Sequence, residues 1–343
     1  MTARPVDPER LVESVPNFSD GQRPAVVDEV VAAFAGAHPE VLVLDRSSDP
    51  DHDRTVLTLA GPGEALVAAA VAGAAACARL IDLRRQHGAH PRMGALDVLP
   101  FVPLGRVGVA ECVALAEEAG RRLVAEAGIP VYFYGAAARR PERAALPAVR
   151  GGGFEALREA APTDPASAPD LGGPALHPTA GATAVGVRPF LVAYNVELAS
   201  DDLGLARSIA ALVRERDGGL PAVRALGIPL PRRRRVQVSM NLLDFRVTPP
   251  AAAFAAVAAA AARAGVGVAG SEVVGLVPEA ALAGVDAADL LLHGFSPDQF
   301  LERRLTQALA ARAASSAAGD GSALAEAGRD PAGSGADLQG GAR

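Results

Sequence analysis

The chain has 343 residues, of which 50% are hydrophobic and 21% are charged, and its formal net charge is −6. This length predicts two domains or lobes, and the hydrophobic fraction excludes a disordered chain. The acidic balance argues against general nucleic-acid binding, and the complete lack of lysine excludes a lysine Schiff base or a pyridoxal-phosphate mechanism.

Cysteine usage and apolar runs indicate where the protein resides. Cys77 and Cys112 lie in apolar helical stretches, so we expect buried thiols and neither a disulfide nor a cysteine-ligated zinc ion. Charged residues occupy the N-terminus where a secretion signal would be apolar. The longest apolar runs, 65–78 and 251–262, are shorter than the roughly 20 residues that span a bilayer. We therefore expect a cytoplasmic protein.

Apolar periodicity predicts alternating strands and helices from residue 11 onward. Pro62 and Glu64 suit the start of a long helix, because proline fits the first turn and the helix dipole favours a carboxylate there. An acidic turn is expected at 47–53. In chain order we expect strands at 11–16, 41–44, 55–60, 98–102 and 131–134, and helices at 24–37, 62–80 and 109–127.

A change of composition divides the chain. Residues 151–181 are rich in Gly, Pro, Ala, Asp and Thr without periodicity, which predicts a connector with functional loops. We place the boundary near Ala180, with an N-terminal lobe at 1–180, a C-terminal lobe at 181–313 and a disordered tail at 314–343. The second lobe is expected to have strands at 190–198, 235–242 and 266–276, and helices at 202–216 and 251–264.

These elements predict an α/β (α+β) fold of two lobes, each with a mixed β-sheet and helices. Leu96-Asp97-Val98 and Leu243-Asp244-Phe245 each lead past prolines into a helix and then a strand. We interpret this likeness as a weak internal duplication of a β-α-β pattern.

The stretch 87–103 is the richest in chemistry and reads His-Gly-Ala-His-Pro-Arg-Met-Gly-Ala-Leu-Asp-Val-Leu-Pro-Phe-Val-Pro. Pro91 disfavours helix at His90, and the glycines give turn freedom, so the polar side chains are expected on a shaped loop. A lone histidine is more often structural. Here the neighbouring Arg92 and Asp97 favour His90 as a catalytic base with an orienting carboxylate.

A metal site is the alternative for this stretch. His87, His90 and Asp97 could be ligands, with the acidic loop 49–53 and its His52 as further donors. Zinc-binding histidine pairs are usually spaced by four residues on a helix, a geometry that Pro91 breaks. We therefore expect no metal.

Polar residues at or within strands suggest a cleft at a sheet edge. Arg54 either holds an anionic group or marks an exposed edge, and Asn17 either faces a ligand or caps a helix. Asn195 lies inside an apolar strand and must find a partner. Asn241 and Asp244 close another strand, although turn chemistry explains such ends one by one.

Other motifs are weaker. Arg232–Arg235 is either a solvated loop or a site for a polyanionic tail. A Gly-x-Gly-x-x-Gly at 265–270 runs from a helix into a strand, the reverse of a dinucleotide site. The triple glycine at 151–153 is no phosphate loop, and no nucleophile elbow occurs.

Several segments resemble the glutamate formimidoyltransferases, in the same order from residue 11 to about 305. The block His-Pro-Arg-Met-Gly-Ala-Leu-Asp-Val, which starts at His90, is too long to match by chance. The similar segments are residues 15–21, 53–56, 87–103, 193–196, 237–244 and 274–278.

The resemblance implies transfer of the formimino group from N-formimino-L-glutamate to N5 of tetrahydrofolate, giving 5-formiminotetrahydrofolate and L-glutamate in histidine breakdown. Tetrahydrofolate would be a co-substrate, polyglutamylated forms included. The family fold has two lobes with ferredoxin-like βαβ elements and a cleft between the sheets. The resemblance also implies a homodimer, and a stand-alone form without the cyclodeaminase domain that some members carry.

The resemblance also implies roles for individual residues. His90 would be the general acid/base. The chemistry of the reaction then suggests that Asp97 holds the imidazole or offsets the cation, and that Arg54 and Arg92 pair with the carboxylates of the donor. Arg232–Arg235 would attract the polyglutamate tail of folate. The family's folate-contacting loop is similar to Gly173, Pro174, Ala175, Leu176, His177, Pro178, Thr179, Ala180 and Gly181, one residue shorter here and without an aromatic; Asn17, Asn195 and Asn241 complete the expected binding residues.

The implied chemistry suits a single imidazole. A protonated amidine is already electrophilic, and a histidine with a pKa near 6.5 can take a proton from the attacking amine and give one to the departing nitrogen. Three alternatives stay open: a formyltransferase that uses 5-formyltetrahydrofolate, a metal-dependent amidine hydrolase, and a non-catalytic folate-binding relative.

Overall fold

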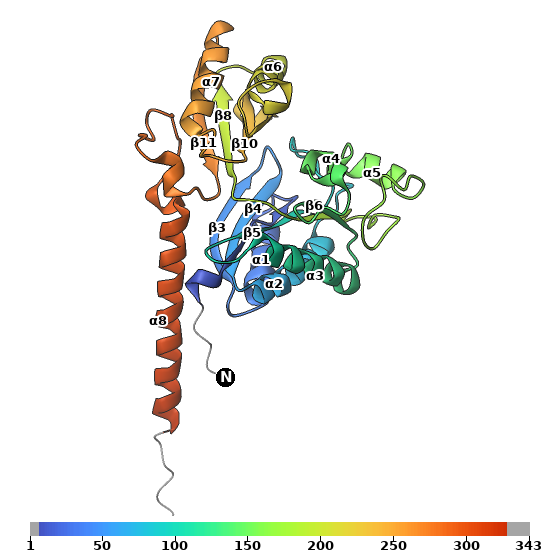
Figure 1. Cartoon of the computed structure of the whole chain (residues 1–343), viewed down its shortest axis with the longest axis vertical. Helices are drawn as coiled ribbons and strands as arrows, with labels where there is room; N and C mark the ends of the chain where they lie inside the picture. Colours follow the sequence, from blue (N-terminus) through green and yellow to red (C-terminus); the bar gives the residue numbers. More distant parts are fainter. Residues whose placement is uncertain (1–6, 328–343) are drawn as a thin grey trace, which may run out of the picture.

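Two β-sheets organise the chain, as the computed structural model shows for residues 7–327 (Figure 1). The first sheet contains β1 (Val12–Ser14), β2 (Asn17–Phe18), β3 (Leu42–Asp49), β4 (Arg54–Gly61), β5 (Leu96–Pro103), β6 (Val131–Gly135) and β7 (Thr183–Val187). The second sheet contains β8 (Val192–Leu198), β9 (Val223–Leu230), β10 (Arg235–Leu242) and β11 (Val268–Val274). The prediction of an α/β fold with two lobes is confirmed, but only the first sheet is mixed, because all strand pairs of the second are antiparallel.

Helices alternate with these strands along the chain. They are α1 (Pro24–Gly36), α2 (Gly63–Leu80), α3 (Val109–Ala127), α4 (Leu146–Arg150), α5 (Phe154–Ala160), α6 (Leu203–Val213), α7 (Pro250–Arg263) and α8 (Leu301–Ala327). Short 3-10 turns occupy 8–10, 141–143, 215–217, 231–233, 279–282 and 297–299. The bounds of α3 are those that the sequence predicts, and α1 and α2 differ by one residue at one end.

The two lobes are built on the same topology. In the first lobe, the elements follow one another along the chain as β1/β2, α1, β3, β4, α2 and β5. Their strands pair antiparallel in the spatial order β5, β1/β2, β4, β3. In the second, β8–α6–β9–β10–α7–β11 has the equivalent order β11, β8, β10, β9. Both are ferredoxin-like split βαβ units. The first lobe adds β7 and β6, which run parallel beside β5.

The predicted duplication is right in kind but wrong in register. Asp97 lies in β5, the last strand of its unit, whereas Asp244 follows β10, the third strand of the other unit. The two Leu-Asp segments therefore do not correspond. Their likeness reflects only that each precedes a proline-containing stretch and a helix.

Pairing between strands also moves several predicted bounds. β7 pairs with β5 and β6, so the first lobe extends past the predicted boundary at Ala180 to Val187. Residues 47–49, predicted as turn, continue β3 because their backbone pairs with β4. β9 was not predicted, because it contains Gly227 and Pro229, which an edge strand tolerates.

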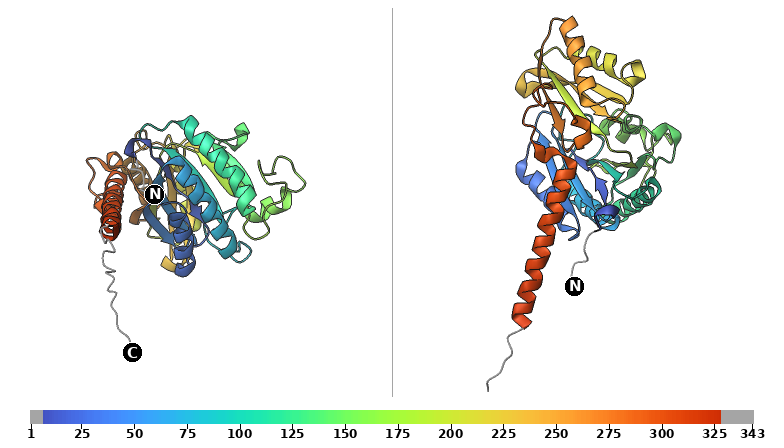
Figure 2. Two further views of the ribbon diagram at one scale, coloured as in Figure 1. Left: turned by 90° about the horizontal axis from the view of Figure 1, so that it is seen from below. Right: turned by 60° about the vertical axis from the view of Figure 1, so that its left-hand side comes forward.

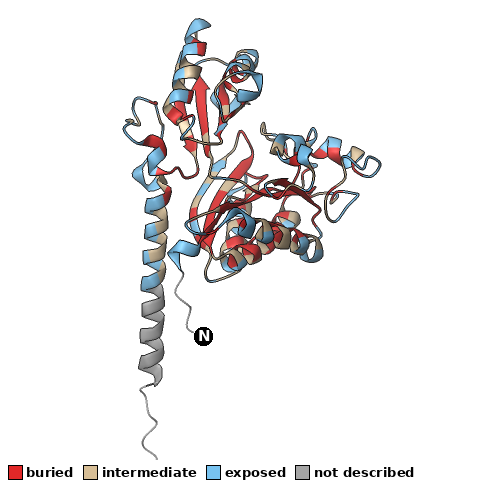
Figure 3. Ribbon diagram, viewed as in Figure 1, coloured by how far each residue is buried: buried red, intermediate tan, exposed pale blue. Residues whose placement is uncertain are grey.

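Helices cover one face of each sheet. α1, α2 and α3 lie side by side on the first sheet, and α6 and α7 pack on the second (Figures 1 and 2). The buried residues gather on these inner faces (Figure 3). α2 is the one helix in the described part that is long and apolar enough to span a membrane, and 56% of it is buried, between α1, α3 and the sheet. Within residues 7–327, the opposite face of each sheet lacks such a helix layer, and the short helix α4 borders that of the first sheet beside β6.

The C-terminal helix α8 runs along the edge strand β3. Arg304 donates to the carbonyl of Leu44, and Leu301 packs with Leu42 and Leu44. Helix continues to Ala327, so the predicted disordered tail is wrong for 314–327. The rest of that prediction, 328–343, lies outside the described residues.

The α1–α2 contact gives a test of the packing. A Cβ at Gly73 would lie 2.2 Å from ring atoms of the fully buried Phe34, whereas Gly36, exposed near the end of α1, has nothing within 4 Å. We expect Gly73→Ala to lower the free energy of unfolding by about 1–3 kcal/mol through overpacking. Gly36→Ala should leave it unchanged or raise it by up to about 1 kcal/mol, because alanine favours helix. Urea denaturation measures both, and an equal effect of the two variants would contradict this packing.

Candidate active site

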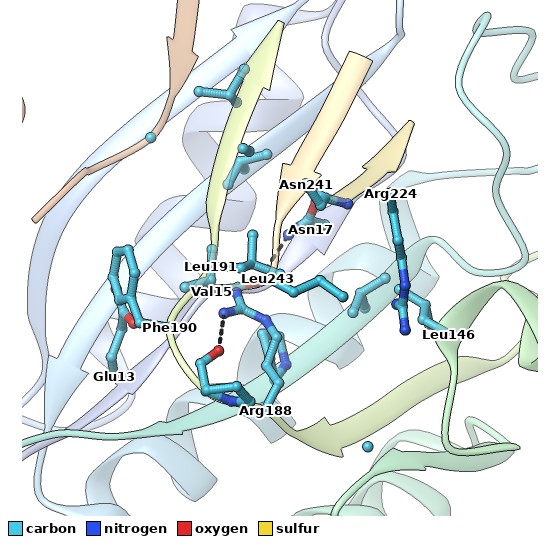
Figure 4. Close-up of a pocket in the computed structure, with 18 of the residues that line it drawn as sticks. Glu13, Val15, Asn17, Leu146, Arg188, Phe190, Leu191, Arg224, Asn241 and Leu243 are labelled. Carbon is cyan, nitrogen blue, oxygen red and sulfur yellow. Dashed lines mark hydrogen bonds between the residues drawn. The ribbon is translucent and has the colours of Figure 1, made fainter. Parts of the chain in front are cut away.

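A cavity of about 840 Å³ lies between the two sheets, on the faces that α1, α2, α3, α6 and α7 leave uncovered, and α4 borders it (Figure 4). Side chains alternate along a strand, so while Tyr194 and Met240 point into the helix-covered core, Asn195 and Asn241 face the cavity. β1 and β2 contribute Glu13, Val15 and Asn17 from the other side. The space is of a size typical of small-molecule sites.

His90 lines this cavity from the loop between α2 and β5. Burial and the positive charges of Arg54 and Arg150 hold the pKa of His90 well below its usual 6.5, although Asp97 opposes them. The ring is therefore neutral at physiological pH and can accept a proton.

The backbone sets the tautomer of His90. Its Nδ1 lies 2.8 Å from the carbonyl oxygen of Pro91. A carbonyl can only accept, so Nδ1 carries the hydrogen and Nε2 keeps the lone pair. Pro91, which the sequence predicts to disfavour helix, thus has a second effect. Its carbonyl engages Nδ1, so Nε2 is the nitrogen that can accept a proton.

Asp97 does not hold the imidazole as predicted, but holds two arginines. Its Oδ2 accepts from Arg54 and Arg150, each at 2.8 Å, and its Oδ1 accepts from the backbone N–H of Met93 at 2.8 Å. Burial opposes ionisation, but the two guanidinium groups outweigh it and hold the pKa of Asp97 well below its usual range. Asp97 is fully buried, so it acts on His90 through charge rather than by a hydrogen bond.

Arg92 lies outside the cavity, which corrects its predicted catalytic place. Its guanidinium forms a bidentate pair with Glu155 at 2.9 Å and donates to Gln86 and to the carbonyl of Leu83. Its Nε, Nη1 and Nη2 each donate to these partners, and it does not line the cavity. Sequence proximity to His90 misled here, because the chain turns at Pro91 and sends the two side chains apart.

The predicted folate loop 173–181 packs behind the His90 segment. Ala95 donates to the carbonyl of Ala180, and Leu83 donates to that of Thr179. His177 accepts from the backbone of Ala180, which closes the turn. None of the nine residues lines the cavity. The loop thus supports the His90 segment from behind, and its contact with folate stays a prediction.

The three predicted asparagines and Arg54 do line the cavity. Asn17 accepts from Arg54 Nε at 3.1 Å, and its own amide donates to the carbonyl of Val15. Asn195 donates to Glu272 at 2.9 Å, which is the partner that its place in an apolar strand requires. Asn241 is exposed toward the cavity from β10. Arg54 shares the single carboxylate of Asp97 with Arg150, so the cluster keeps a net positive charge beside His90.

His52 is a second imidazole at the site that sequence reasoning considered only as a metal ligand. Its ring centroid lies 5.8 Å from that of His90. Its Nε2 accepts from the side-chain nitrogen of Gln237 at 2.8 Å, and burial lowers its pKa, so the ring is neutral. Scarcity of histidines in the chain was the one signal that could have paired the two.

Arginines that sequence reasoning missed make the cavity positive. Arg150, Arg188 and Arg224 line it, together with Tyr134. Nε of Arg150 is buried without a partner, and neither Arg188 nor Arg224 forms an ion pair within residues 7–314. Unpaired guanidinium groups of this kind suit bidentate binding of carboxylates. Two carboxyls also line the cavity: Asp244, which pairs with Arg246, and Glu13, whose pKa burial raises to about 7.

The run Arg232–Arg235 sits beside the cavity rather than in it. Arg233 pairs with Glu197 and with Asp49 of the first lobe, and Arg235 also pairs with Glu197. Half of this run is thus neutralised by carboxylates of the chain itself. No group of three or more His, Cys, Asp or Glu residues that could hold a metal ion occurs among the described residues.

The Asp97 cluster yields a stability prediction. Asp97→Asn would leave Arg54 and Arg150 buried without a full counter-charge, so we expect a loss of about 3–5 kcal/mol in the free energy of unfolding. Asp28→Asn removes an exposed pair with Arg46 and should cost less than about 1 kcal/mol. Chemical denaturation at neutral pH compares them, and equal losses would show that the cluster is not the structural centre of the site.

Comparison with known proteins follows the two-lobe division. The family model for the N-terminal subdomain of the formiminotransferase domain matches residues 11–188, and that for the formiminotransferase domain matches 193–296. The gap between the matches falls where the structure changes from the first sheet to the second.

Individual relatives agree. Over 300 residues, the chain is 43% identical to glutamate formimidoyltransferase of Thermoplasma acidophilum. The matched region covers 87% of this chain and 98% of that protein. It is 42% identical to the enzyme of the same name from Streptococcus pyogenes, over 83% of this chain and 94% of that protein. It is 45% identical to formimidoyltransferase-cyclodeaminase of Sus scrofa, over 81% of this chain and 52% of that protein. The chain therefore belongs to the formiminotransferase family, as a transferase of the glutamate formimidoyltransferase type.

Proposed function

We propose that this chain transfers the formimino group of N-formimino-L-glutamate to N5 of tetrahydrofolate, with His90 as general base and then general acid. The products are 5-formiminotetrahydrofolate and L-glutamate, which places the reaction in histidine breakdown. The observation that carries the proposal is the neutral His90 in the cavity, with Nδ1 engaged by Pro91 and Nε2 left to accept.

The proton balance of the reaction needs one such group. The N5 amine attacks the carbon of the amidinium, and the tetrahedral intermediate carries an excess proton on N5. Nε2 of His90 takes that proton and then gives it to the glutamate nitrogen, whose bond to the carbon breaks. A positioned acid–base of this kind contributes about 10²–10⁴-fold in rate.

The arginines around the cavity have two roles in this proposal. Arg54 and Arg150 lower the pKa of His90, which keeps it a base at neutral pH and makes its imidazolium a better acid. Arg188 and Arg224 are proposed to bind the carboxylates of the substrates, in place of the predicted Arg92. Two bound substrates held between the sheets gain further rate from orientation.

The assay that tests the function mixes the purified protein with formiminoglutamate and tetrahydrofolate and follows the folate spectrum, with and without EDTA. We expect transfer that depends on folate and is insensitive to the chelator. Transfer only from 5-formyltetrahydrofolate would identify a formyltransferase, and folate-independent turnover abolished by EDTA a metal-dependent hydrolase. Either result would overturn the proposal.

Substitution of His90 tests its role. His90→Ala should lower kcat by about 10²-fold or more while tetrahydrofolate still binds, because proton transfer is lost but the cavity is kept. His87→Ala, a histidine on the same loop that does not line the cavity, is the control and should keep its rate. Rates from stopped assays and affinities from calorimetry decide, and an undiminished rate in His90→Ala would remove His90 from the mechanism.

The pH profile tests the charge effect on His90. The base works when neutral, so kcat at saturating substrates should fall on acidification with a midpoint below 6.5. Arg150→Gln removes a nearby positive charge and should move that midpoint upward, toward 6.5. A midpoint that stays in place in this variant would show that the arginine does not tune the imidazole.

A further inference from the structure

Glu13 is a buried carboxyl that the mechanism does not use. It lies in β1, is 1% exposed and lines the cavity, yet its Oε2 has no hydrogen-bond partner within residues 7–314. Its neighbours across the sheet are Ala60 on β4 and Val102 on β5, which offer no polar side chain. Arg188 is the cation whose charge acts on Glu13, but the two form no ion pair. Such a group is costly to keep unless something in the cavity pairs with it.

The position of Glu13 relative to His90 limits what that partner can be. Glu13 and Asn17 are four residues apart along extended chain, a separation of about 13 Å, which the matching offsets on β4 and β5 support. Figure 4 shows the two side chains at different ends of the cavity. His90 is at the Asn17 end, because its pKa responds to Arg54, which contacts Asn17.

We propose that Glu13 binds the 2-amino-4-oxopyrimidine edge of the pterin ring of tetrahydrofolate and so points N5 at His90. This inference rests on the proposed function. The pterin edge presents N–H donors side by side at N3 and the 2-amino group, and an ionised carboxylate can accept both in a bidentate pair. N5 is on the other ring of the bicycle, toward the His90 end.

The alternative partner, the amidinium of the donor, fits the distances less well. A carboxylate also pairs with an amidinium. Binding there would hold the transferred carbon at Glu13, four residues along the strand from the Asn17 end of the cavity where His90 lies. A pterin that pairs with Glu13 by its pyrimidine edge instead extends from the carboxylate toward that end, which leaves room for the donor beside His90.

The test combines a variant with a modified substrate. Glu13→Gln keeps the shape but replaces one acceptor oxygen by an amide, and the probe is a tetrahydrofolate analogue with methyl in place of the 2-amino group. We expect the wild-type protein to prefer tetrahydrofolate over the analogue by about 10–100-fold in affinity, the range for a hydrogen bond to a charged group. Glu13→Gln should lose that factor for tetrahydrofolate, discriminate little between the two, and keep its KM for formiminoglutamate. Glu118→Gln, the same change of charge on α3 beside Arg121, should behave as wild type.

Two outcomes would overturn the inference. One is unchanged discrimination in Glu13→Gln, and the other is a rise in the KM for formiminoglutamate with unchanged folate affinity, which would assign the carboxyl to the amidinium. Affinities come from calorimetry without the donor. If the protein binds tetrahydrofolate through Glu13 but transfers no formimino group, the proposed function is contradicted. The inference about Glu13 is not.

A stability measurement checks the premise that Glu13 is unpaired before substrate binds. Burial raises the folded-state pKa of Glu13 to about 7 from its ordinary value of 4.5, so the folded protein loses stability as pH rises from about 4.5 through 7. Without ligand, Glu13→Gln should therefore melt at a higher temperature than wild type at pH 8, with the advantage shrinking toward pH 5. A variant that melts lower at pH 8 would reveal a stabilising partner within the protein and overturn the inference.

Discussion

The buried ion cluster around Asp97 is the constraint on which the site depends. One carboxylate, fully buried at the start of β5, joins Arg54 from β4, Arg150 from the end of α4 and the backbone of Met93. The three charged side chains come from separate stretches of chain, Met93 lies four residues before Asp97, and none of the three charges could be buried alone. The same two guanidinium groups lower the pKa of His90. The same ion cluster therefore holds the segment that carries His90 in place and lowers the pKa of His90.

The cavity follows from how two ferredoxin-like units are placed. Each unit covers one face of its sheet with helices, and the open faces meet across the cavity. Polar residues on those faces are poorly satisfied within the chain: the Nε of Arg150, the Oε2 of Glu13 and the Oε1 of Gln237 are buried without partners. Natural proteins accept such local costs at functional sites. The cavity is therefore a region where stability is exchanged for complementarity to charged, hydrogen-bonding substrates.

Much of the fold could be predicted because its signals are local. Helix 109–127 has a strong amphipathic period and a glycine at its end, and its predicted bounds are those of α3. Prolines mark the starts of α1 and α2 in the same way. β7 and β9 were not predicted, because neither has an alternating apolar pattern. β7 is a short buried strand after a connector, and β9 is an edge strand that contains Gly227 and Pro229. Such strands exist because of their neighbours, which periodicity does not report.

The sequence by itself determined the His90 loop, the family that the loop resembles and the chemistry that a single imidazole suits. It could not show which arginine lies at the site. Arg92 is two residues from His90 but turns away from it, whereas Arg150 is distant in sequence and donates to Asp97. His52 and Glu13 came to the site only through the pairing of β1, β3 and β4. The tertiary structure decided these because backbone turns and strand register set which side chains share a face, and the burial of that face sets their charge.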